Sequence, residues 1–400
     1  MSDLTRNAVD VLPEGRLQEQ LESGRPLRVK LGIDPTTADI HLGHTVVLGK
    51  LAEFQQAGHQ VVLIIGDFTA RVGDPSGRSA TRPVPSAEEV EANAATYQEQ
   101  AFKILDRERT EVRRNSEWLR MEPEALLGLL AQTTVARLLE RDDFQKRLAA
   151  GQPIAALELL YPLLQGYDSV AVEADLELGG TDQKFNLLFG RDVQAAYGQR
   201  PQSIMTLPIL VGTDGERKMS KSLGNYVGVT DAPEEMFGRL MSIPDEAMDE
   251  YYRLLLGEER PHGPPNEAKR ALARRIVDRF HGEGSGVAAE EHFNRVFVQR
   301  SIPEEIPEFH IGQIQDLQIT IAAGEAGTSV SIGQTVHLPK LMAGAFGISS
   351  SEARRLIQQG GVKLDGEQLP AEPLDLEVAS LDGRVLQVGK RRFCRLRATP

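Results

Sequence analysis

The stretch KLGIDPTTADIHLGH, residues 30–44, connects a strand-like run to a helix-like segment. Residues 27–33 form a short apolar run that ends in a Gly/Asp/Pro turn, and residues 41–57 have helix-forming character up to Gly58. His41, Gly43 and His44 therefore fall in the first turn of the predicted helix. Unpaired N–H groups and the helix dipole attract phosphate there, imidazoles can donate to phosphate or ribose oxygens, and glycine lets an adenine ring approach. Taken alone, both histidines could equally be solvated cap residues.

The rest of the first half continues the alternation of strands and helices. A second strand is predicted at residues 61–66, and a capping box at Ser86 opens a predicted helix over residues 86–107. Further strands are predicted at 170–178 and 204–211. This order predicts an α/β fold with a Rossmann-like parallel sheet covered on both faces, in which ligands bind beyond the carboxyl ends of the strands.

Composition narrows the function classes. The 400 residues are 40% hydrophobic and 26% charged, which excludes a disordered, collagen-like or coiled-coil chain as a whole. The single cysteine, Cys394, cannot form an internal disulfide, and the start has no apolar core of a signal peptide. No stretch reaches the ~18 to 20 apolar residues of a membrane span, so we expect a cytoplasmic protein with no membrane partner. The net charge of −13 argues against indiscriminate binding to nucleic acid through bulk charge but does not exclude a local basic face.

A second motif, KMSKS at residues 218–222, lies in the Gly/Asp-rich loop after the strand predicted at 204–211. Lys218 and Lys221 suit a triphosphate, because their charge can stabilise pyrophosphate as it leaves. Lysines in loops are usually only solvated. Five specified residues that follow a His-x-Gly-His at a strand-to-helix turn argue against that interpretation here.

The pair HLGH and KMSKS resembles the signature motifs of class I aminoacyl-tRNA synthetases, which have a Rossmann-like catalytic domain. KLGIDPTTADIHLGH, GDPSGR, YPLLQGYD and GGTDQKFN further resemble the bacterial tyrosyl-tRNA synthetases over nearly the whole chain. That family activates L-tyrosine with ATP to tyrosyl-adenylate and pyrophosphate, then transfers the tyrosyl group to the terminal adenosine of tRNA(Tyr). The resemblance implies this tyrosine–tRNA ligase activity, with ATP and Mg²⁺, no bound organic cofactor and no dedicated metal site.

The resemblance also implies which residues face ATP. The implied catalytic residues are Thr36, His41, His44, Arg78, Arg82, Lys218, Lys221 and Ser222. The implied ATP-binding residues are Gly32, Gly43, His44, Gly180, Asp182 and Lys221. Thr36 and His41 would contact the terminal phosphates, and Asp182 would hold the ribose. Because the tyrosine carboxylate is already a competent nucleophile, positioning and charge stabilisation would supply catalysis without a general base.

The amino-acid pocket is predicted on one helix face. Tyr161, Gln165 and Asp168 are spaced i, i+4 and i+7, so a helix would project all three side chains together. By the resemblance, Asp168 would accept the phenolic hydroxyl. Tyr161 and Gln165 would bind the α-ammonium with Asp74, and Gln183 would lie beside the carboxylate. In isolation, Tyr161 would more often be a half-buried aromatic residue and Asp168 a surface charge.

Lys30 departs from the pattern of many family members. They have a tyrosine at this position that shares the substrate hydroxyl, and Leu31 replaces a polar ribose contact of some members. A lysine here resembles a second bacterial subtype. Lys30 could be the second partner of the phenol or could pair with a carboxylate elsewhere.

The domain organisation is likewise predicted partly from the resemblance. Residues 1–227 would be the catalytic domain, with a homodimer-interface insertion near 109–150. The remaining ranges are a helical anticodon-binding domain at 228–321, a linker at 322–335 and an α+β S4-like RNA-binding domain at 336–400.

The S4-like part carries the predicted tRNA contacts. Residues 336–400 hold ten Lys+Arg against seven Asp+Glu. Arg354, Arg355 and Lys363 would contact tRNA phosphates. The tail KRRFCRLR could extend this basic face, or Phe393 and Leu396 could form the inner face of a closing strand.

Three alternatives compete with this interpretation. A tryptophanyl enzyme shares the class architecture but would be expected to lack the S4-like tail and the pattern of Tyr161, Gln165 and Asp168. Nucleotidyltransferases such as pantothenate synthetase have the His-x-Gly-His without the full KMSKS. A noncatalytic RNA-binding regulator would be expected to carry damaged motifs, whereas both phosphate motifs are intact.

Overall fold

The computed structural model describes residues 4–36, 39–75, 85–298, 306–314, 318–323, 330–389 and 392–398. The chain divides into two compact units, Met1–Ala289 and Glu290–Pro400. This division differs from the boundaries expected after residues 227 and 321. None of the described helices is long and apolar enough to cross a membrane.

The first unit is built on a six-stranded sheet with the order β1-β6-β5-β2-β3-β4. Its strands are β1 (Asp10–Leu12), β2 (Arg28–Ile33), β3 (Gln60–Ile65), β4 (Thr110–Arg114), β5 (Leu176–Gly180) and β6 (Ser203–Leu207). Only β1 runs antiparallel to its neighbour, and all other pairs are parallel. The predicted α/β fold class with a parallel sheet is confirmed.

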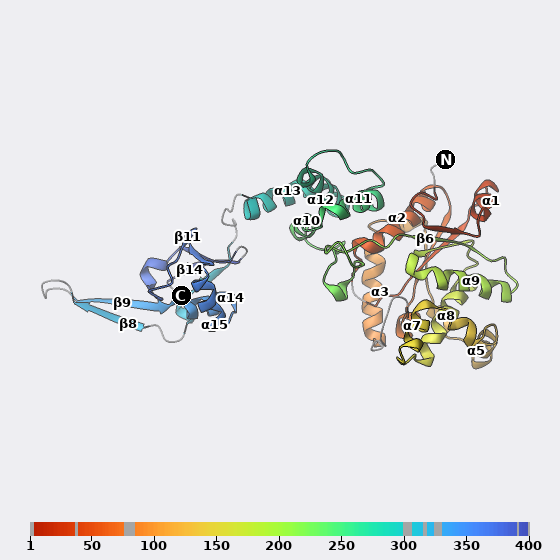
Figure 1. Ribbon diagram of the computed structural model, residues 1–400, viewed down its shortest axis with the longest axis horizontal. Coiled ribbons are helices and arrows are strands. Elements are labelled where there is room, and N and C mark those ends of the chain that lie inside the picture. The colour runs from red at the N-terminus through yellow and green to blue at the C-terminus, as the bar shows by residue number, and fades with distance from the viewer. Residues whose placement is uncertain are drawn as a thin grey trace. The chain divides into compact units, whose positions relative to one another are not determined.

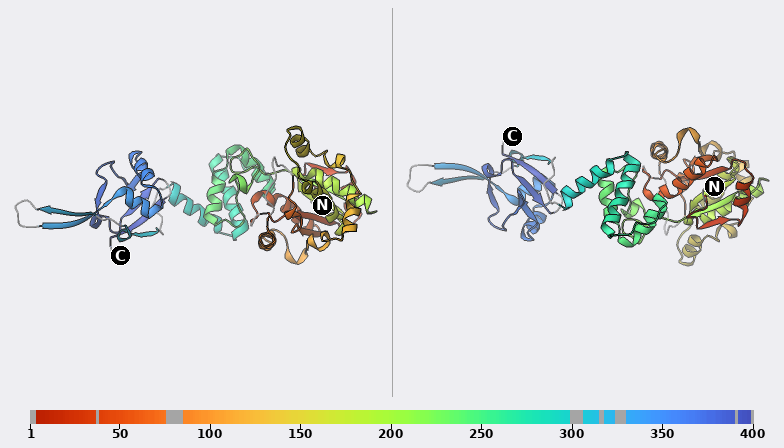
Figure 2. Two further views of the ribbon diagram at one scale, coloured as in Figure 1. Left: turned by 90° about the horizontal axis from the view of Figure 1, so that it is seen from below. Right: turned by 90° about the horizontal axis from the view of Figure 1, so that it is seen from above.

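Helices lie on both faces of this sheet (Figures 1 and 2). The helices before residue 227 are α1 (Arg16–Glu22), α2 (Leu42–Gln56), α3 (Ala87–Ala101), α4 (Ser116–Leu119), α5 (Pro123–Leu130), α6 (Val135–Leu138), α7 (Asp142–Ala149), α8 (Ala156–Ala171) and α9 (Lys184–Ala196). The helices α10 (Pro233–Met241), α11 (Met248–Tyr251) and α12 (Pro265–His281) form a group beside the sheet, and α13 (Ser285–Phe293) crosses the unit boundary (Figure 1). The strand β3 reads QVVLII, and all five apolar residues of it are buried. Such a continuous apolar strand is typical of a sheet that is covered on both sides.

Several element boundaries differ from those predicted. Residues 170 and 171 complete α8 instead of beginning a strand, and β5 starts only at Leu176. The helix predicted over 86–107 ends at Ala101, although Ser86 does accept the predicted capping bond from the Glu89 N–H.

The helices after residue 227 pack on the Rossmann-like sheet unit, which explains why they belong to the same compact body. Tyr251 Oη donates to the Val211 carbonyl over 2.8 Å, and Lys103 Nζ donates to the Phe280 carbonyl over 3.1 Å. Both contacts tie the helical segment to sequence-distant parts of the first unit.

The second unit is a small α+β body. Its elements are β7 (Glu308–His310), β8 (Gln318–Ala323), β9 (Val330–His337), α14 (Leu338–Phe346), α15 (Ser350–Gln358), β10 (Val362–Leu364), β11 (Glu367–Gln368), β12 (Asp375–Glu377), β13 (Val385–Val388) and β14 (Arg392–Arg397). One sheet has the order β11-β10-β13-β14-β7, and the other has the order β12-β9-β8. Ser349 caps α15 by accepting from the Glu352 N–H.

Two expectations for this unit meet a different structure. The range 322–335, expected to be a linker, includes the paired ends of β8 and β9, and its residues 324–329 lie outside the described residues. In the tail, Phe393 and Leu396 are both buried, but three residues apart in β14 they lie on opposite faces of the strand. Leu396 packs in the apolar core of the unit and Phe393 does not, so the two do not form a common inner face, and β14 lies between β13 and β7 instead of closing the sheet.

Candidate active site

One cavity of about 460 Å³ opens at the carboxyl ends of β2 and β5. These two strands are neighbours, but the chain passes through β3 and β4 on one side of β2 before it returns to β5. Ligands of open parallel sheets bind at such a switch point, and about 300 to 1,000 Å³ is the usual size of a small-molecule pocket. The predicted site residues that line it are Gly32, Thr36, His41, Gly43, His44, Asp74, Tyr161, Gln165, Asp168, Gly180, Asp182, Gln183, Lys218, Lys221 and Ser222.

The other predicted site residues do not lie in this cavity. Arg78 and Arg82 lie outside the described residues. Arg354, Arg355 and Lys363 belong to the second unit, where both arginines are exposed. Among the residues that the structure describes, no group of three or more His, Cys, Asp or Glu could hold a metal ion.

The start of α2 presents two neutral imidazoles to the cavity. The His41 backbone N–H donates to His44 Nδ1 over 3.2 Å, so the ring proton of neutral His44 is on Nε2. Burial, and then the positive charges of Lys221 and Lys218, lower the pKa of His44 to about 4. A Cβ on Gly43 would lie 3.0 Å from the His41 ring, a tight contact that a glycine avoids. His44 can therefore act as a hydrogen-bond donor without changing its charge.

The KMSKS loop carries both of its lysines in ion pairs. Lys221 Nζ lies 2.5 Å from Asp39 Oδ2, and Lys218 Nζ lies 3.4 Å from Asp182 Oδ2. The Lys221 side chain is only 18% exposed. Two positive charges thus stand beside the imidazoles, each held by a carboxylate that an anionic ligand would have to displace.

The opposite end of the cavity is organised by Asp168 on α8. Its carboxylate accepts from Trp118 Nε1 over 2.8 Å and from Asn115 Nδ2 over 3.3 Å. Burial raises the pKa of Asp168 to about 7, against the positive charge of Lys30 and these two hydrogen bonds. A buried carboxylate with fixed donors behind it is a specific acceptor for a ligand hydroxyl.

Asp34, which the sequence reasoning did not single out, lies between the two ends. Tyr161 Oη donates to Asp34 Oδ2 over 2.9 Å, and Thr69 Oγ1 donates to Asp34 Oδ1 over 2.7 Å. A Cβ on Gly66 would come within 2.0 Å of Asp34 Oδ1, so glycine is required there. Burial raises the pKa of Asp34 to about 7. The sequence feature that could have identified Asp34 as a site residue is its position in the Gly-x-Asp-Pro-Thr turn.

Gln183 connects the site to the insertion helices. Its Nε2 donates to Asp74 Oδ2 over 2.8 Å, and its Oε1 accepts from Asn186 Nδ2 over 3.1 Å. Asn186 in turn accepts from the buried Arg141. Asn115, Trp118 and Arg141 lie in the range expected to form an interface, and no motif there pointed to the cavity.

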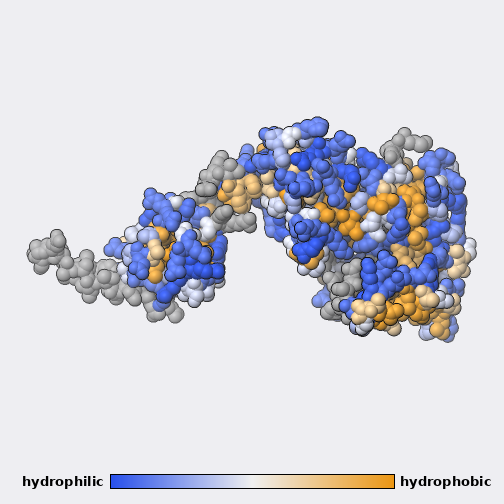
Figure 3. All heavy atoms as spheres, in the orientation of Figure 1, coloured by the Kyte–Doolittle hydropathy of each residue, from blue (hydrophilic) through white to orange (hydrophobic). Residues whose placement is uncertain are grey.

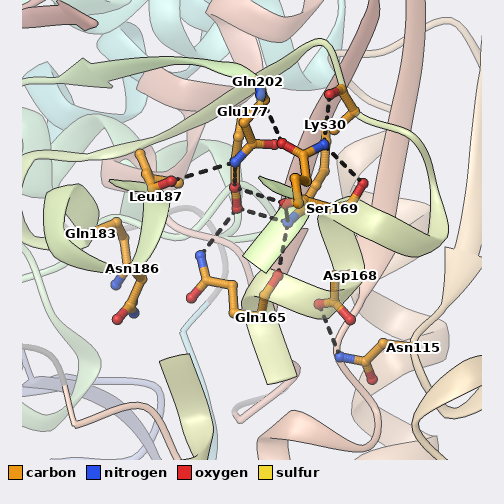
Figure 4. Close-up of polar contacts among 12 residues, drawn as sticks. Lys30, Asn115, Gln165, Asp168, Ser169, Glu177, Gln183, Asn186, Leu187 and Gln202 are labelled. Atoms are coloured by element: carbon orange, nitrogen blue, oxygen red, sulfur yellow. Dashed lines mark hydrogen bonds and ion pairs between the residues drawn. The ribbon is translucent and has the colours of Figure 1, made fainter. Parts of the chain in front are cut away.

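The structure decides between the two possibilities for Lys30. Its ammonium pairs with Glu177 over 2.9 Å, and both side chains are essentially unexposed, at 0% and 1%. Figure 4 shows this pair beside Gln165 and Ser169. Lys30 therefore pairs with a carboxylate.

Comparisons with known proteins show the family to which the chain belongs. A family model described as class I tRNA synthetases (W and Y) matches residues 22–298. The tyrosine–tRNA ligase of Thermotoga maritima is 51% identical over 98% of this chain and 96% of its own length. That of Geobacter sulfurreducens is 49% identical over 99% of this chain and 98% of its own length.

Solved structures show the same fold. A C-terminally truncated mitochondrial tyrosyl-tRNA synthetase from Aspergillus nidulans has a TM-score of 0.59 at 22% identity, covering 72% of this chain and 91% of that chain. The resemblance drawn from the motifs is confirmed by the family model and the relatives. The chain belongs to the class I tRNA synthetases of the tryptophan and tyrosine group and, within it, to the tyrosyl-tRNA synthetases.

Proposed function

We propose that this protein is a tyrosine–tRNA ligase that activates L-tyrosine with ATP and transfers the tyrosyl group to tRNA(Tyr). The observation that carries the proposal is a single cavity with two different ends. One end has the imidazoles and the lysines of the two phosphate motifs, and the other has the carboxylate of Asp168 with its fixed donors.

ATP–pyrophosphate exchange with tyrosine, phenylalanine and tryptophan offered separately tests the function. Exchange with tyrosine alone is expected, because only tyrosine brings a hydroxyl to Asp168. Exchange with tryptophan would assign the protein to the sister enzyme. No exchange with any of the three would favour the RNA-binding regulator.

In the proposed mechanism, the tyrosine carboxylate attacks the α-phosphorus of ATP and pyrophosphate leaves. Thr36, His41 and His44 would hold phosphate and ribose oxygens, and Lys218 and Lys221 would stabilise the charge that develops on pyrophosphate. Arg78 and Arg82 would share this task. Mg²⁺ would arrive with ATP, where it neutralises phosphate oxygens. Orientation and charge stabilisation supply the acceleration, and no residue needs to act as a general base.

Asp182 and the glycines complete the proposed ATP site. Asp182 would hold the ribose, while Gly32, Gly43 and Gly180 would allow close approach of the nucleotide to the backbone. At the tyrosine end, Tyr161, Gln165 and Asp74 would bind the α-ammonium, and Gln183 would lie beside the carboxylate.

Tyrosine affinity is expected to fall as the pH is lowered through about 7. Burial raises the pKa of Asp168 to about 7, so this carboxylate is protonated below that pH and loses its capacity as a charged acceptor. Binding measured by equilibrium dialysis should be at least about tenfold weaker near pH 5.5 than near pH 8. Asp168→Asn should reduce the pH dependence, and Asp34, whose pKa burial also raises to about 7, accounts for the part that remains. A flat wild-type profile would contradict the role of Asp168.

We propose a homodimer whose interface is formed by the insertion near 109–150. Exposed apolar side chains gather there: Leu127 on α5 is 65% exposed, Val135 on α6 is 60% exposed, and Leu148 on α7 is 61% exposed. Figure 3 shows hydrophobic side chains on the end of the first unit where α5 and α7 lie. An exposed apolar patch of this kind is typical of a protein interface.

Introducing negatively charged side chains into this patch should separate the subunits. The double substitution Leu127→Asp and Leu148→Asp is expected to halve the molar mass measured by light scattering, because two buried carboxylates would oppose association. Val287→Asp is the matched control, since Val287 is 50% exposed on α13, away from the insertion. A monomeric wild type would refute the dimer.

We also propose that the second unit binds tRNA through Arg354, Arg355 and Lys363, as an S4-like domain, and that the helices after residue 227 face the anticodon arm. Both arginines are exposed on α15. A local basic surface on a chain of net charge −13 favours a docked RNA over indiscriminate binding. The expected cytoplasmic location and the absence of DNA and membrane partners stay predictions.

Replacing Arg354, Arg355 and Lys363 together by alanine should weaken tRNA charging without affecting tyrosine activation. Each lost phosphate contact is expected to lower the salt dependence of tRNA binding by about one unit of slope. The control replaces Arg384 and Arg397, which already pair with Asp365 and Glu308. Equal loss of activation and charging would mean that the three residues stabilise the fold instead.

A further inference from the structure

A buried ion pair borders the proposed tyrosine site, where Glu177 lines the cavity and Lys30 stands behind it. Lys30 on β2 and Glu177 on β5 stand opposite each other in the parallel sheet, and neither is exposed beyond 1%. The proposed reaction assigns no task to Lys30 or Glu177. Buried ion pairs contribute little net stability compared with apolar residues of similar volume, so their presence beside a pocket calls for another explanation.

The ammonium of Lys30 has no proton left for a substrate. Its three protons have three acceptors, namely Glu177 Oε1 over 2.9 Å, Ser169 Oγ over 2.7 Å and the Gln165 carbonyl over 3.2 Å. Figure 4 shows these contacts converging on the lysine from β5 and α8. Lys30 therefore acts on the substrate only through its neighbours.

The carboxylate of Glu177 determines which way the Gln165 carboxamide faces. An ionised carboxylate can only accept hydrogen bonds, and Gln165 Nε2 donates to Glu177 Oε1 over 3.1 Å. The carboxamide oxygen is thereby turned away from Glu177. Gln165 Oε1 is buried and has no hydrogen-bond partner among the described residues, and Gln165 lines the cavity. A buried acceptor without a partner beside a ligand pocket is suited to receive an N–H of the ligand.

We propose that the Lys30–Glu177 pair is a positioning unit for tyrosine, which holds the Gln165 carboxamide with its oxygen toward the α-ammonium of the substrate. The proposal rests on the proposed tyrosine activation. Lys30 compensates the buried charge of Glu177, and Glu177 fixes the amide. A neutral glutamine in place of Glu177 could either donate or accept, so it would leave the orientation of Gln165 undetermined.

A second effect of the pair acts on the other end of tyrosine. The positive charge of Lys30 lowers the pKa of Asp168, against the stronger effect of burial, while the more weakly acting Glu177 raises it. The same lysine that compensates Glu177 thus also favours the ionised form of the hydroxyl acceptor. The charge of Lys30 therefore acts at both polar ends of the amino acid, through Gln165 at the ammonium and through Asp168 at the hydroxyl.

Three variants test the proposal in tyrosine-dependent ATP–pyrophosphate exchange. Glu177→Gln removes the acceptor-only group, and the double variant Lys30→Met with Glu177→Gln removes both charges together, which avoids an unpaired buried lysine. Glu158→Gln is the matched control. Glu158 lies on α8, the helix that carries Gln165, and forms a buried ion pair with Arg147 of α7. It does not line the cavity.

Two inhibitors separate the ends of the substrate. Tyramine keeps the ammonium and lacks the carboxylate, whereas 3-(4-hydroxyphenyl)propionate keeps the carboxylate and lacks the ammonium. In both Glu177 variants, the KM for tyrosine should rise about tenfold or more with a smaller change in kcat, and inhibition by tyramine should weaken by a similar factor. In Glu177→Gln, inhibition by the propionate should change much less, because Lys30 remains beside Asp168. In the double variant both inhibitors lose the effect of Lys30 on Asp168, so the extra weakening of tyramine relative to the propionate measures the ammonium contact.

The outcomes are distinguishable. If wild type shows no tyrosine-dependent exchange, the proposed function itself fails. If wild type is active but the double variant, with its fold confirmed by thermal unfolding, keeps the wild-type KM and the wild-type ratio of the two inhibition constants, the pair is only structural and the proposal is overturned. Equal weakening of both inhibitors would also overturn it, because the loss would not be specific to the ammonium.

Discussion

Replacing Lys221 by alanine is expected to slow tyrosyl-adenylate formation by about 100- to 1,000-fold, the usual cost of removing one preorganised group that stabilises transition-state charge. Lys221 stands at the phosphate end of the cavity, opposite Asp168, so it does not contact the amino acid. Tyrosine affinity should therefore stay within about twofold. Single-turnover measurement of adenylate formation and equilibrium dialysis of tyrosine give the two quantities separately.

Lys184→Ala is the control for Lys221. Lys184 also forms a lysine–aspartate pair, with Asp10 at 2.5 Å, but it does not line the cavity. It should leave the single-turnover rate unchanged. An unchanged rate in Lys221→Ala as well would remove the lysine from the proposed mechanism.

Asp168→Asn is expected to lower kcat/KM for tyrosine by about 10- to 100-fold, since a hydrogen bond to a charged group is worth about 1.5 to 3 kcal/mol. The new amide must also place an N–H near the donors of Trp118 and Asn115, which now face the carboxylate. Phenylalanine has no hydroxyl, so the kcat/KM for phenylalanine should fall far less. The preference for tyrosine over phenylalanine should therefore shrink in the exchange assay.

Asp175→Asn provides the comparison for Asp168. Asp175 is held by Arg25 and by the Arg28 N–H near the start of β5, outside the cavity. This variant should lower stability without changing the ratio of tyrosine to phenylalanine. If Asp168→Asn also left that ratio unchanged, the phenol would bind elsewhere.

The sequence predicted the parts of the fold and site that depend on local pattern. The apolar run before Asp34 and the helix after His41 could be recognised because strand and helix periodicities are local. The spacing of Tyr161 and Asp168 likewise predicted a common helix face, and α8 places both in the cavity.

The remaining features depend on contacts between distant segments. Trp118 and Asn115 reach Asp168 across about fifty residues of sequence, and Lys30 reaches Glu177 only because β2 and β5 are neighbours in the sheet. The helices after residue 227 join the first unit through packing rather than through any linker signal. No periodicity in a single segment encodes such pairings.

The ion pairs of the KMSKS loop also decide which anions can occupy the resting pocket. Lys221 and Lys218 are already neutralised by Asp39 and Asp182, which are tethered at high effective concentration. A monovalent or small anion must compete for one lysine at a time against such a tethered carboxylate. A triphosphate can engage both lysines and the start of α2 together, so the resting pairs favour a ligand with several phosphates over an anion that can replace only one carboxylate.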